Sequence, residues 1–235
     1  MNIFYCENIE GDEVVLEEND SKHLVRVLRN KIGDHVILVD GKGLWCEGTI
    51  VDDHPKRTQI HIDSRDQKPT QDFHLHVAIA PIKSMDRFEI FLEKATEIGI
   101  SEITLLKTKH GIRDKVNMDR CQKILIAAMK QSLKAELPKL NPMISVEEFV
   151  QQPLIGQKLI AHCENGPKSP IKKVYQKGSD VVIMIGPEGD FNPTEIEAAT
   201  KTGFEGIDLG KTRLRNETAG IVVVHSFHLL NYDGE

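Results

Sequence analysis

The sequence predicts an α/β protein in which a small all-β domain precedes a parallel β-sheet with helices on both faces. Residues 1–64 form short strand-like runs separated by turns, whereas the chain beyond residue 72 alternates strand-like and helix-like segments. Such alternation is typical of a parallel sheet. The run 181–185 is apolar on both alternating faces, as expected of an interior strand that is covered on two sides.

The N-terminal region favours a small β-barrel or sandwich. Five runs rich in β-branched and apolar residues, NIFYC, EVVLE, HVILVD, LWCEGTIV and TQIHID, are separated by turn signals such as Asp40-Gly41-Lys42-Gly43. One helix is expected among them, in NDSKHLVRVLRN, where Leu24, Val27 and Leu28 share a helical face and Asp20 or Ser21 can cap it. Its polar side presents Lys22, His23, Arg26 and Arg29.

A boundary between two domains is expected at residues 64–72. This segment is polar, contains proline and lacks periodicity, which is typical of a linker. We therefore predict one domain over residues 1–68 and a second over residues 73–235.

The second domain is expected to alternate strands and helices. The helix 85–98 places five apolar residues on one face and ends at Gly99. Asn192, Pro193 and Glu195 form a capping box that opens another helix, and Ser145 with Glu148 opens a short one. The expected elements are strands at 74–82, 102–107, 158–163, 181–185 and 206–210, and helices at 85–98, 118–135, after 145, from 193 to near 203, and over 217–232.

Two glycine loops follow strands of this sheet. Gly186 and Gly189 bracket the loop after strand 181–185, and Gly210 follows the next strand. Open α/β sheets bind ligands at the carboxyl ends of their strands, where backbone amides point outward. We therefore expect a pocket between these loops, with arginine at its rim to hold an anionic oxygen. The alternative, that the glycines only turn the chain, stays open.

The charge pattern favours a polyanionic partner. The net charge is −6, yet lysine and arginine gather in residues 22–31, 107–115, 166–178 and 211–215. Segregated positive charge on an otherwise acidic protein suits binding of phosphates. The alternative is that each cluster is only a solvated surface.

Several classes of protein are disfavoured. The four cysteines form no C-x-x-C pair, so neither a disulfide framework nor a zinc site is indicated. No apolar run has membrane-spanning length and the acidic start is unlike a signal peptide, so we expect a cytoplasmic protein. P-loop, dinucleotide, hydrolase and zinc-protease motifs are missing. The pairs His74/His76 and His225/His228 make a metal conceivable, but structural roles are favoured.

Four segments together resemble the RsmE family of ribosomal RNA methyltransferases, in the SPOUT superfamily. They are MIGPEGDF, LGKTRLRNETA, KSMDRFEIFLEKATEIGI and HLVRVLRNKIGD. The resemblance extends from the N-terminal domain to the C-terminus. It implies a PUA-like β-barrel that binds RNA, followed by an α/β domain whose parallel sheet carries a trefoil knot. It also implies a homodimer that uses S-adenosyl-L-methionine (SAM) to methylate N3 of one uridine in 16S ribosomal RNA of the small subunit.

The resemblance also implies which residues hold the cofactor. The loops 186–189 and 210–214 would be the crossing segments of the knot, and residues 162–164 would complete the pocket. Glycine suits a place where two backbones and a ligand meet closely, because a Cβ would fill the same volume. The implied cofactor-binding residues are His162, Glu164, Ile185, Gly186, Pro187, Glu188, Gly189, Leu209, Gly210, Leu214, Asn216, Thr218 and Ala219.

For the chemistry, the neutral N3 of uridine must lose its proton, or the anion that results must be stabilised. Arg215 is expected to stabilise this anion, with Arg213 behind it, and Glu217 or Glu188 to accept the proton. The expected catalytic pair is therefore Arg215 and Glu217. The residues expected to bind RNA are Lys22, His23, Arg26, Arg29, Lys83 and Arg213.

Two positions depart from the family pattern. Asp190 stands where the family has glycine, and aspartate tolerates the left-handed region better than most residues. Lys134 stands where the family favours arginine. Lysine keeps the positive charge but lacks the planar, bidentate set of donors of a guanidinium. The alternative function is a non-catalytic RNA-binding protein that retains the fold. An enzyme for a different phosphorylated molecule is disfavoured by the basic N-terminal domain.

Overall fold

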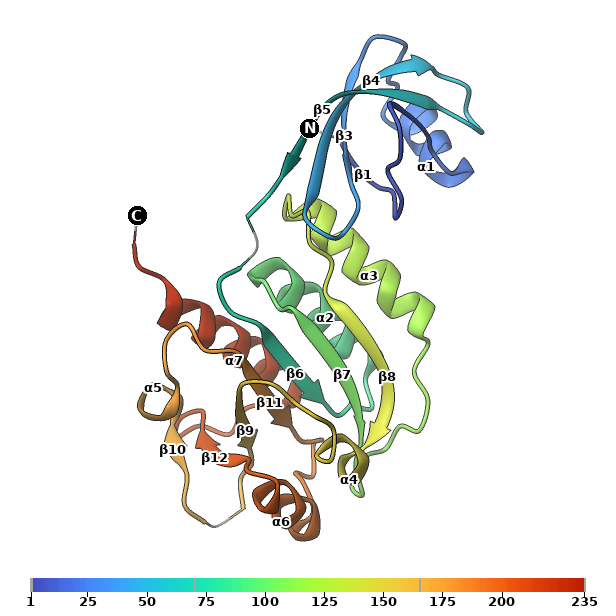
Figure 1. Ribbon diagram of the computed structural model, residues 1–235. Helices are drawn as coiled ribbons and strands as arrows, with labels where there is room; N and C mark the ends of the chain where they lie inside the picture. Colours follow the sequence, from blue (N-terminus) through green and yellow to red (C-terminus); the bar gives the residue numbers. More distant parts are fainter. Residues whose placement is uncertain (1, 70, 165, 235) are drawn as a thin grey trace. The chain divides into compact units, whose positions relative to one another are not determined.

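The computed structural model describes residues 2–69, 71–164 and 166–234, which form two compact units (Figure 1). Unit 1 is Met1–Thr70 with Met129–Leu137, and unit 2 is Gln71–Ala128 with Pro138–Glu235. The bounds and functions that we assign to the two domains stay predictions, and residues 1, 70 and 235 lie outside the described residues.

Unit 1 is built on a five-stranded sheet of order β1-β3-β4-β5-β2. The outer pair β1 and β3 is parallel and the other pairs are antiparallel. The strands are β1 (Ile3–Tyr5), β2 (Glu13–Val15), β3 (His35–Val39), β4 (Leu44–Asp52) and β5 (Gln59–Gln67). Each begins in a run that the sequence predicts as a strand, and β4 and β5 extend beyond their runs.

Strand β5 continues into the predicted linker, so that prediction is wrong for residues 64–67. The long strand β4 pairs with this segment, placing Cys46 opposite Arg65 and Leu44 opposite Gln67. Ladder hydrogen bonds use the backbone and are indifferent to side-chain polarity, and for this reason a polar segment can extend an edge of the sheet.

The helical segment of unit 1 is α1 (Glu18–Lys22) followed by the π-helix η1 (His23–Val27). The backbone N–H of Leu28 donates to the carbonyl of His23 at 3.0 Å, five residues back. This wider turn rotates the following side chains. Leu24 is buried, but Val27 is 64% exposed, so the predicted shared apolar face is wrong for Val27 and Leu28, which is also exposed.

The predicted N-cap is also wrong. The helix begins after Glu17, which makes no side-chain cap hydrogen bond. Ser21 instead lies buried, where its hydroxyl donates to the carbonyl of Leu16 at 3.1 Å and accepts from the N–H of Thr58 at 2.9 Å. Ser21 therefore links the helix to the sheet rather than capping it.

Residues 129–137 complete a second core in unit 1. Met129 and Ala135 pack with Ile3, Ile37 and Val39, on the opposite side of the sheet from the cluster around Leu24 and Leu38. Side chains of alternate residues along a strand point to opposite faces, so β3 contributes to both clusters.

Unit 2 contains a seven-stranded sheet, in the described residues, of order β10-β12-β9-β11-β6-β7-β8. Every pairing in it is parallel, which confirms the predicted sheet. The strands are β6 (Leu75–Ile79), β7 (Glu102–Lys107), β8 (Lys139–Ser145), β9 (Gln157–Ala161), β10 (Ser169–Pro170), β11 (Val181–Ile185) and β12 (Glu205–Asp208). Strand β11 lies between β9 and β6 with all five residues buried, so the predicted interior strand is confirmed.

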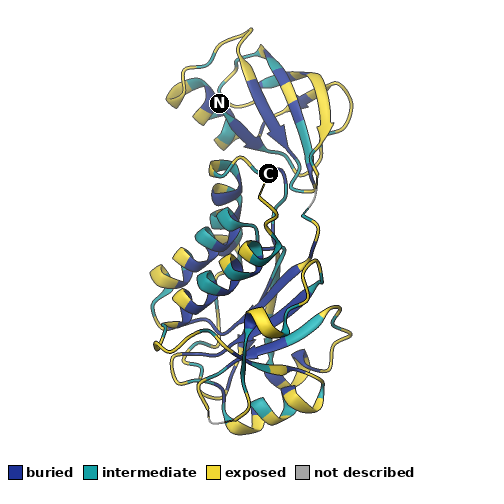
Figure 2. Ribbon diagram, turned by 90° about the vertical axis from the view of Figure 1, so that its left-hand side faces the viewer, coloured by how far each residue is buried: buried dark blue, intermediate teal, exposed yellow. Residues whose placement is uncertain are grey.

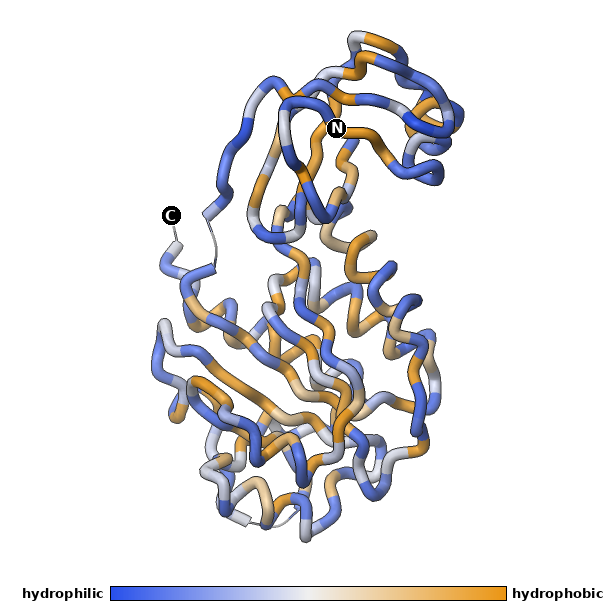
Figure 3. Tube along the Cα trace, turned by 45° about the vertical axis from the view of Figure 1, so that its right-hand side comes forward, coloured by the Kyte–Doolittle hydropathy of each residue, from blue (hydrophilic) through white to orange (hydrophobic). Residues whose placement is uncertain are grey.

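Helices cover both faces of this sheet. Against one face lie α2 (Met85–Ile98) and α7 (Asn216–Asn231), which pack on each other. Against the other lie α4 (Val146–Phe149) and α6 (Pro193–Lys201), whose side chains share a buried cluster with β11. The central strands β6 and β11 are buried and mostly hydrophobic, whereas the helices turn exposed residues outward (Figures 2 and 3). The remaining helices are α3 (Met118–Gln131) and α5 (Ile171–Val174).

The sequence predictions for unit 2 needed three corrections. The helix predicted to reach residue 135 ends at Gln131, because Leu133 has a left-handed backbone with φ of 56°. Strand β8 was not predicted: it is an edge strand of intermediate burial that contains Pro142, which weakens the strand signal. The short elements β10 and α5 were not predicted either.

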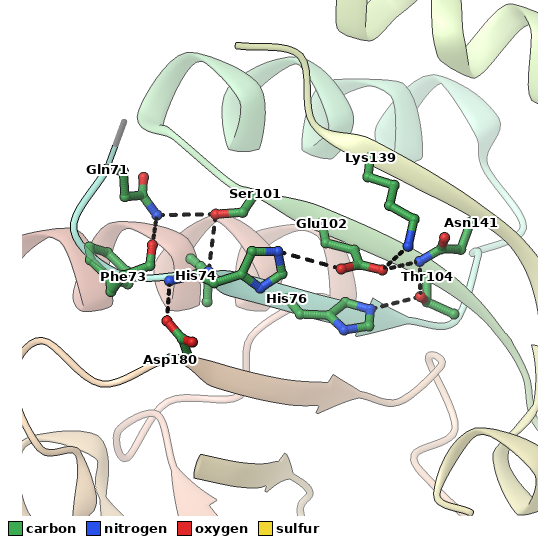
Figure 4. A network of polar contacts seen from close by, with 11 residues as sticks. Gln71, Phe73, His74, His76, Ser101, Glu102, Thr104, Lys139, Asn141 and Asp180 are labelled. Carbon is green, nitrogen blue, oxygen red and sulfur yellow. Dashed lines mark hydrogen bonds and ion pairs between the residues drawn. The ribbon is translucent and has the colours of Figure 1, made fainter. Parts of the chain in front are cut away.

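A polar network lies at the amino ends of β6, β7 and β8 (Figure 4). The buried His76 shares a 2.7 Å hydrogen bond with Thr104, and Glu102 accepts from Lys139 at 3.0 Å and from Asn141 at 2.6 Å. Burial lowers the pKa of His76 to about 4. Among the described residues, no group of three or more histidine, cysteine, aspartate or glutamate side chains is placed to hold a metal ion. The network connects three neighbouring strands.

Candidate functional site

A cavity of about 910 Å³ lies in unit 2 at the carboxyl ends of β9, β11 and β12. It is the edge of the sheet opposite to the network of Figure 4. The cavity brings together the three segments that the sequence predicts to form a pocket. Its lining consists of Arg87, residues 161–164, Lys168, residues 185–190, residues 207–217 and Ala219.

The first wall is the loop that follows β11. A Cβ on Gly186 would lie 3.0 Å from the ring and 3.1 Å from the backbone nitrogen of Phe191, so the chain turns here at a residue without a side chain. The loop closes with a hydrogen bond of 2.9 Å from the N–H of Asp190 to the carbonyl of Pro187. Asn192 and Glu195 then form the predicted capping box, which begins α6.

The second wall is the loop between β12 and α7. Asp208 accepts the N–H of Gly210 at 2.8 Å, and Gly210 has φ of 123°, a conformation that favours glycine. Arg213 and Arg215 line the cavity with exposed side chains. The extended backbone of Arg215 leads directly into α7, which confirms that the last segment is a helix.

Asn216, the first residue of α7, links two strands below the cavity. It is buried, and its Nδ2 donates to the carbonyls of Ala80 and Gly186, which follow β6 and β11. Because an amide nitrogen has two hydrogens, both donors are used. The carbonyl Oδ1 is then the group of Asn216 that can bind a ligand.

Two buried polar atoms of the cavity residues have no hydrogen-bond partner among the described residues. They are Oδ1 of Asn216 and Nδ1 of His162. Buried polar atoms are nearly always hydrogen-bonded, so unpaired ones beside a cavity indicate a polar ligand. Burial, with a smaller contribution from Lys168, lowers the pKa of His162, which keeps its ring neutral at pH 7. A neutral imidazole can both donate and accept.

Glu217 lies at the cavity beside Arg87, which the sequence did not single out. Glu217 is 9% exposed, and its Oε1 is 4.0 Å from Nε of Arg87 on α2. Arg87 comes from the segment KSMDRFEIFLEKATEIGI, in which no residue was assigned to the cofactor or to the chemistry. Only the packing of α2 against α7 brings the two side chains together. The lining residues outside the segments that the sequence assigned to the pocket are Arg87, Ala161, Lys168, Ile207 and Asp208, together with Asp190, which it noted only as a departure from the family pattern.

Some predicted residues lie outside the cavity lining. Thr218 is exposed on the first turn of α7, and Lys83 is exposed while its carbonyl accepts from Arg113 at 2.6 Å. The four basic residues expected to bind RNA belong to unit 1. His23, Arg26 and Arg29 are exposed there, whereas Lys22 forms an ion pair of 2.6 Å with Glu18. The roles of all these residues stay predictions.

Comparison with known proteins identifies the family. A family model described as an RNA methyltransferase domain matches residues 69–228, and one described as an RNA methyltransferase PUA domain matches residues 16–63. Ribosomal RNA small subunit methyltransferase E of Rickettsia conorii is 28% identical over 227 residues, covering 94% of this chain and 91% of that protein.

Solved structures extend the similarity to the whole chain. A probable rRNA-methyltransferase from Porphyromonas gingivalis has a TM-score of 0.92 at 34% identity. A ribosomal RNA small subunit methyltransferase E from Neisseria gonorrhoeae, bound to S-adenosyl methionine, has a TM-score of 0.88 at 26% identity. Each comparison covers 98% of both chains. The chain therefore belongs to the family of RNA methyltransferases that includes ribosomal RNA small subunit methyltransferase E.

Proposed function

We propose that the protein is a SAM-dependent methyltransferase that modifies N3 of a specific uridine in 16S ribosomal RNA. The observation that carries this proposal is the cavity itself: three backbone loops at one edge of a parallel sheet, with a cationic rim of Arg87, Arg213 and Arg215. Family membership supports the reaction class, and the Neisseria relative was solved with S-adenosyl methionine bound.

The residues of the cavity fit this cofactor. An adenine ring needs donors and acceptors along its edge, and the loops 186–189 and 209–214 present backbone groups for this purpose. The unpaired Oδ1 of Asn216 and Nδ1 of His162 add two further polar groups. When bound, the cofactor supplies a methyl group on a positively charged sulfur.

The residues of the rim then act on the uridine. Arg215, with Arg213 behind it, stabilises the negative charge that spreads over O2 and O4 as N3 loses its proton. Glu217 accepts that proton, for it is enclosed at the cavity beside Arg87. Glu188, the other candidate, lies on the exposed surface of its loop. Positioning of the two substrates contributes at least as much to the rate acceleration as proton transfer does.

Unit 1 binds the RNA substrate in this proposal. The match to a PUA domain supports an RNA-binding role for residues 1–68, and His23, Arg26 and Arg29 are exposed to contact phosphates. Residues 73–235 are the proposed methyltransferase domain. The trefoil knot and the homodimer stay proposals that come from the family resemblance.

The proposed site of action is the cytoplasm, where ribosomal RNA is modified. In the described part of the chain, no helix combines the length and the apolar character that crossing a membrane requires.

The decisive experiment incubates the protein with labelled SAM and small ribosomal subunits that lack the modification, then digests the RNA. Labelled 3-methyluridine is the expected product. Label at another position of the base would contradict the proposed N3 specificity while leaving the reaction class intact. Calorimetry with SAM tests the alternative of a non-catalytic RNA-binding protein, for which we expect no heat of binding.

A further inference from the structure

The cavity is open because two neighbouring strands part at its floor. The parallel ladder between β9 and β11 ends with the pair Ala161 and Ile185. The next residues of both strands, from His162 and from Gly186, are cavity walls. A wall segment that has left the ladder needs another partner for its backbone N–H groups.

Asp190 provides that partner across the gap. Its Oδ2 accepts the backbone N–H of Cys163 at 2.6 Å, and its Oδ1 accepts the N–H of Phe191 at 2.8 Å. Both oxygens of one carboxylate are thus used by backbone donors, one on each wall. A carboxylate forms shorter and stronger hydrogen bonds to such donors than a neutral acceptor does.

The backbone of Asp190 is fixed as well. Its φ is 66°, in the left-handed region, and its N–H bonds the carbonyl of Pro187 at 2.9 Å. Its own carbonyl lies 3.2 Å from Nδ1 of His110. A carbonyl can only accept, so His110 carries its hydrogen on Nδ1 and donates from the loop after β7. Three segments therefore converge on this one residue.

We propose that Asp190 is a positioning residue, whose carboxylate ties the wall that contains Cys163 to the loop 186–189 and thereby sets the width of the cofactor pocket. The inference rests on the proposed function, because it takes SAM as the ligand. Glycine at position 190 could not take this role, because the two hydrogen bonds are accepted by side-chain oxygens.

Two variants separate the tie from the backbone conformation. Asp190→Gly removes both oxygens and adopts the left-handed conformation without strain. Asp190→Asn keeps the size but has only one oxygen to accept from two backbone donors. We expect the Kd for SAM, measured by calorimetry, to rise on the order of tenfold in Asp190→Gly and by a smaller factor in Asp190→Asn.

Amide hydrogen exchange reports on the tie directly. The amide of Cys163 should exchange faster in Asp190→Gly than in the wild-type protein, with no SAM present. The matched control is Glu197→Gln, which removes an exposed carboxylate that pairs with Lys201 on α6 and should leave both the Kd and the exchange rate unchanged.

The outcomes distinguish the two levels of the proposal. Wild-type protein that binds SAM, together with an unchanged Kd in Asp190→Gly, would overturn the positioning role alone, even if that variant melted at a lower temperature. Unaltered exchange at Cys163 would likewise show that the tie is not formed. Wild-type protein that binds no SAM would overturn the proposed function, and this inference with it.

Discussion

At the scale of single residues, the two cavity glutamates that are candidates for the proton acceptor lie in different surroundings. Glu217 is enclosed beside Arg87, whereas Glu188 lies on an exposed loop. A side chain that must accept a proton from a bound base works best where its orientation is fixed. The difference between the two carboxylates therefore assigns them different expected roles.

We predict that Glu217→Gln lowers kcat for ribosomal RNA by about 10²- to 10⁴-fold, the usual contribution of a general base, while the Kd for SAM changes little. Single-turnover methylation and calorimetry measure the two quantities. Glu188→Gln is the matched comparison and should retain most of the rate. A large loss in Glu188→Gln with little loss in Glu217→Gln would exchange the two assignments.

The sequence revealed the glycine loops but not the contacts between them. Gly186, Gly189 and Gly210 could be predicted as pocket residues because each follows a strand of a parallel sheet, and that relation is local. The pairing of Arg87 with Glu217 joins two helices that are far apart in the chain. The bond from Cys163 to Asp190 crosses between two loops. Neither leaves a periodic or compositional signal.

At the scale of elements, α7 approaches the sheet closely at Gly220. A Cβ at this position would lie 2.5 Å from a ring carbon of Phe91 on α2 and 3.3 Å from Ile79 on β6. Alanine in place of glycine normally stabilises a helix by about 1 kcal/mol. Here the ring of Phe91 is fully buried and has little room to move. We therefore expect the clash to outweigh the gain in helix propensity, so that alanine at this position destabilises the protein.

We predict that Gly220→Ala lowers the free energy of unfolding by roughly 1 to 3 kcal/mol, as expected for overpacking of a core. Denaturant titration measures it. Ala198→Gly on α6 reports the ordinary cost of glycine in a helix and serves as the reference. A more stable Gly220→Ala protein would show that the two helices separate without cost.

The network of Figure 4 makes the stability of unit 2 depend on pH. Burial lowers the pKa of His76 to about 4, with His74 and Lys139 acting in the same direction and Glu102 opposing them. The folded protein thus favours the neutral ring. The stabilisation is complete above the ordinary value near 6.5 and is lost as the pH falls from about 6.5 toward 4.

We predict that the free energy of unfolding falls by on the order of 2 kcal/mol between pH 7 and pH 4.5. Denaturant titrations at several pH values measure the slope. His76→Gln should flatten it, whatever the stability of that variant at pH 7. His225→Gln, at an exposed position on α7, should keep the wild-type slope. Equal slopes in all three proteins would contradict the assignment to His76.

Strand and helix positions in unit 2 were largely predictable, since apolar runs and capping residues mark them locally. The helix α2 was predicted with its observed bounds. The π-turn of η1 was not, because the same residues in an α-helix would give an apolar stripe. Strand β8 was not predicted because its own composition gives no strand signal; it forms a strand through its pairing with β7.

At the scale of the whole molecule, the overall charge is negative, whereas the groups expected to bind RNA are positive. The protein carries a net charge of −6, so we expect binding of RNA to depend on local basic groups, for which Arg26 and Arg29 are our proposed candidates. We predict that replacing both by alanine weakens binding of ribosomal RNA and reduces the salt dependence of log K by about 2, one for each lost phosphate contact. The Kd for SAM should stay unchanged.

Filter binding at several salt concentrations and calorimetry test this prediction. Lys201→Ala removes an exposed positive charge from α6 and is the control for a change of net charge. An equal loss of SAM binding in the double variant would contradict the division of the chain into an RNA-binding and a cofactor-binding domain.

Unit 1 is discontinuous in sequence, because Met129–Leu137 belong to it although more than fifty residues of unit 2 come before them. A chain still on the ribosome must therefore hold Ile3, Ile37 and Val39 uncovered until residue 137 has been made. At roughly 5–20 residues per second, that delay lasts several seconds. Unit 1 therefore cannot finish folding when residue 70 has been made, and waits until the first part of unit 2 and residues 129–137 have followed it.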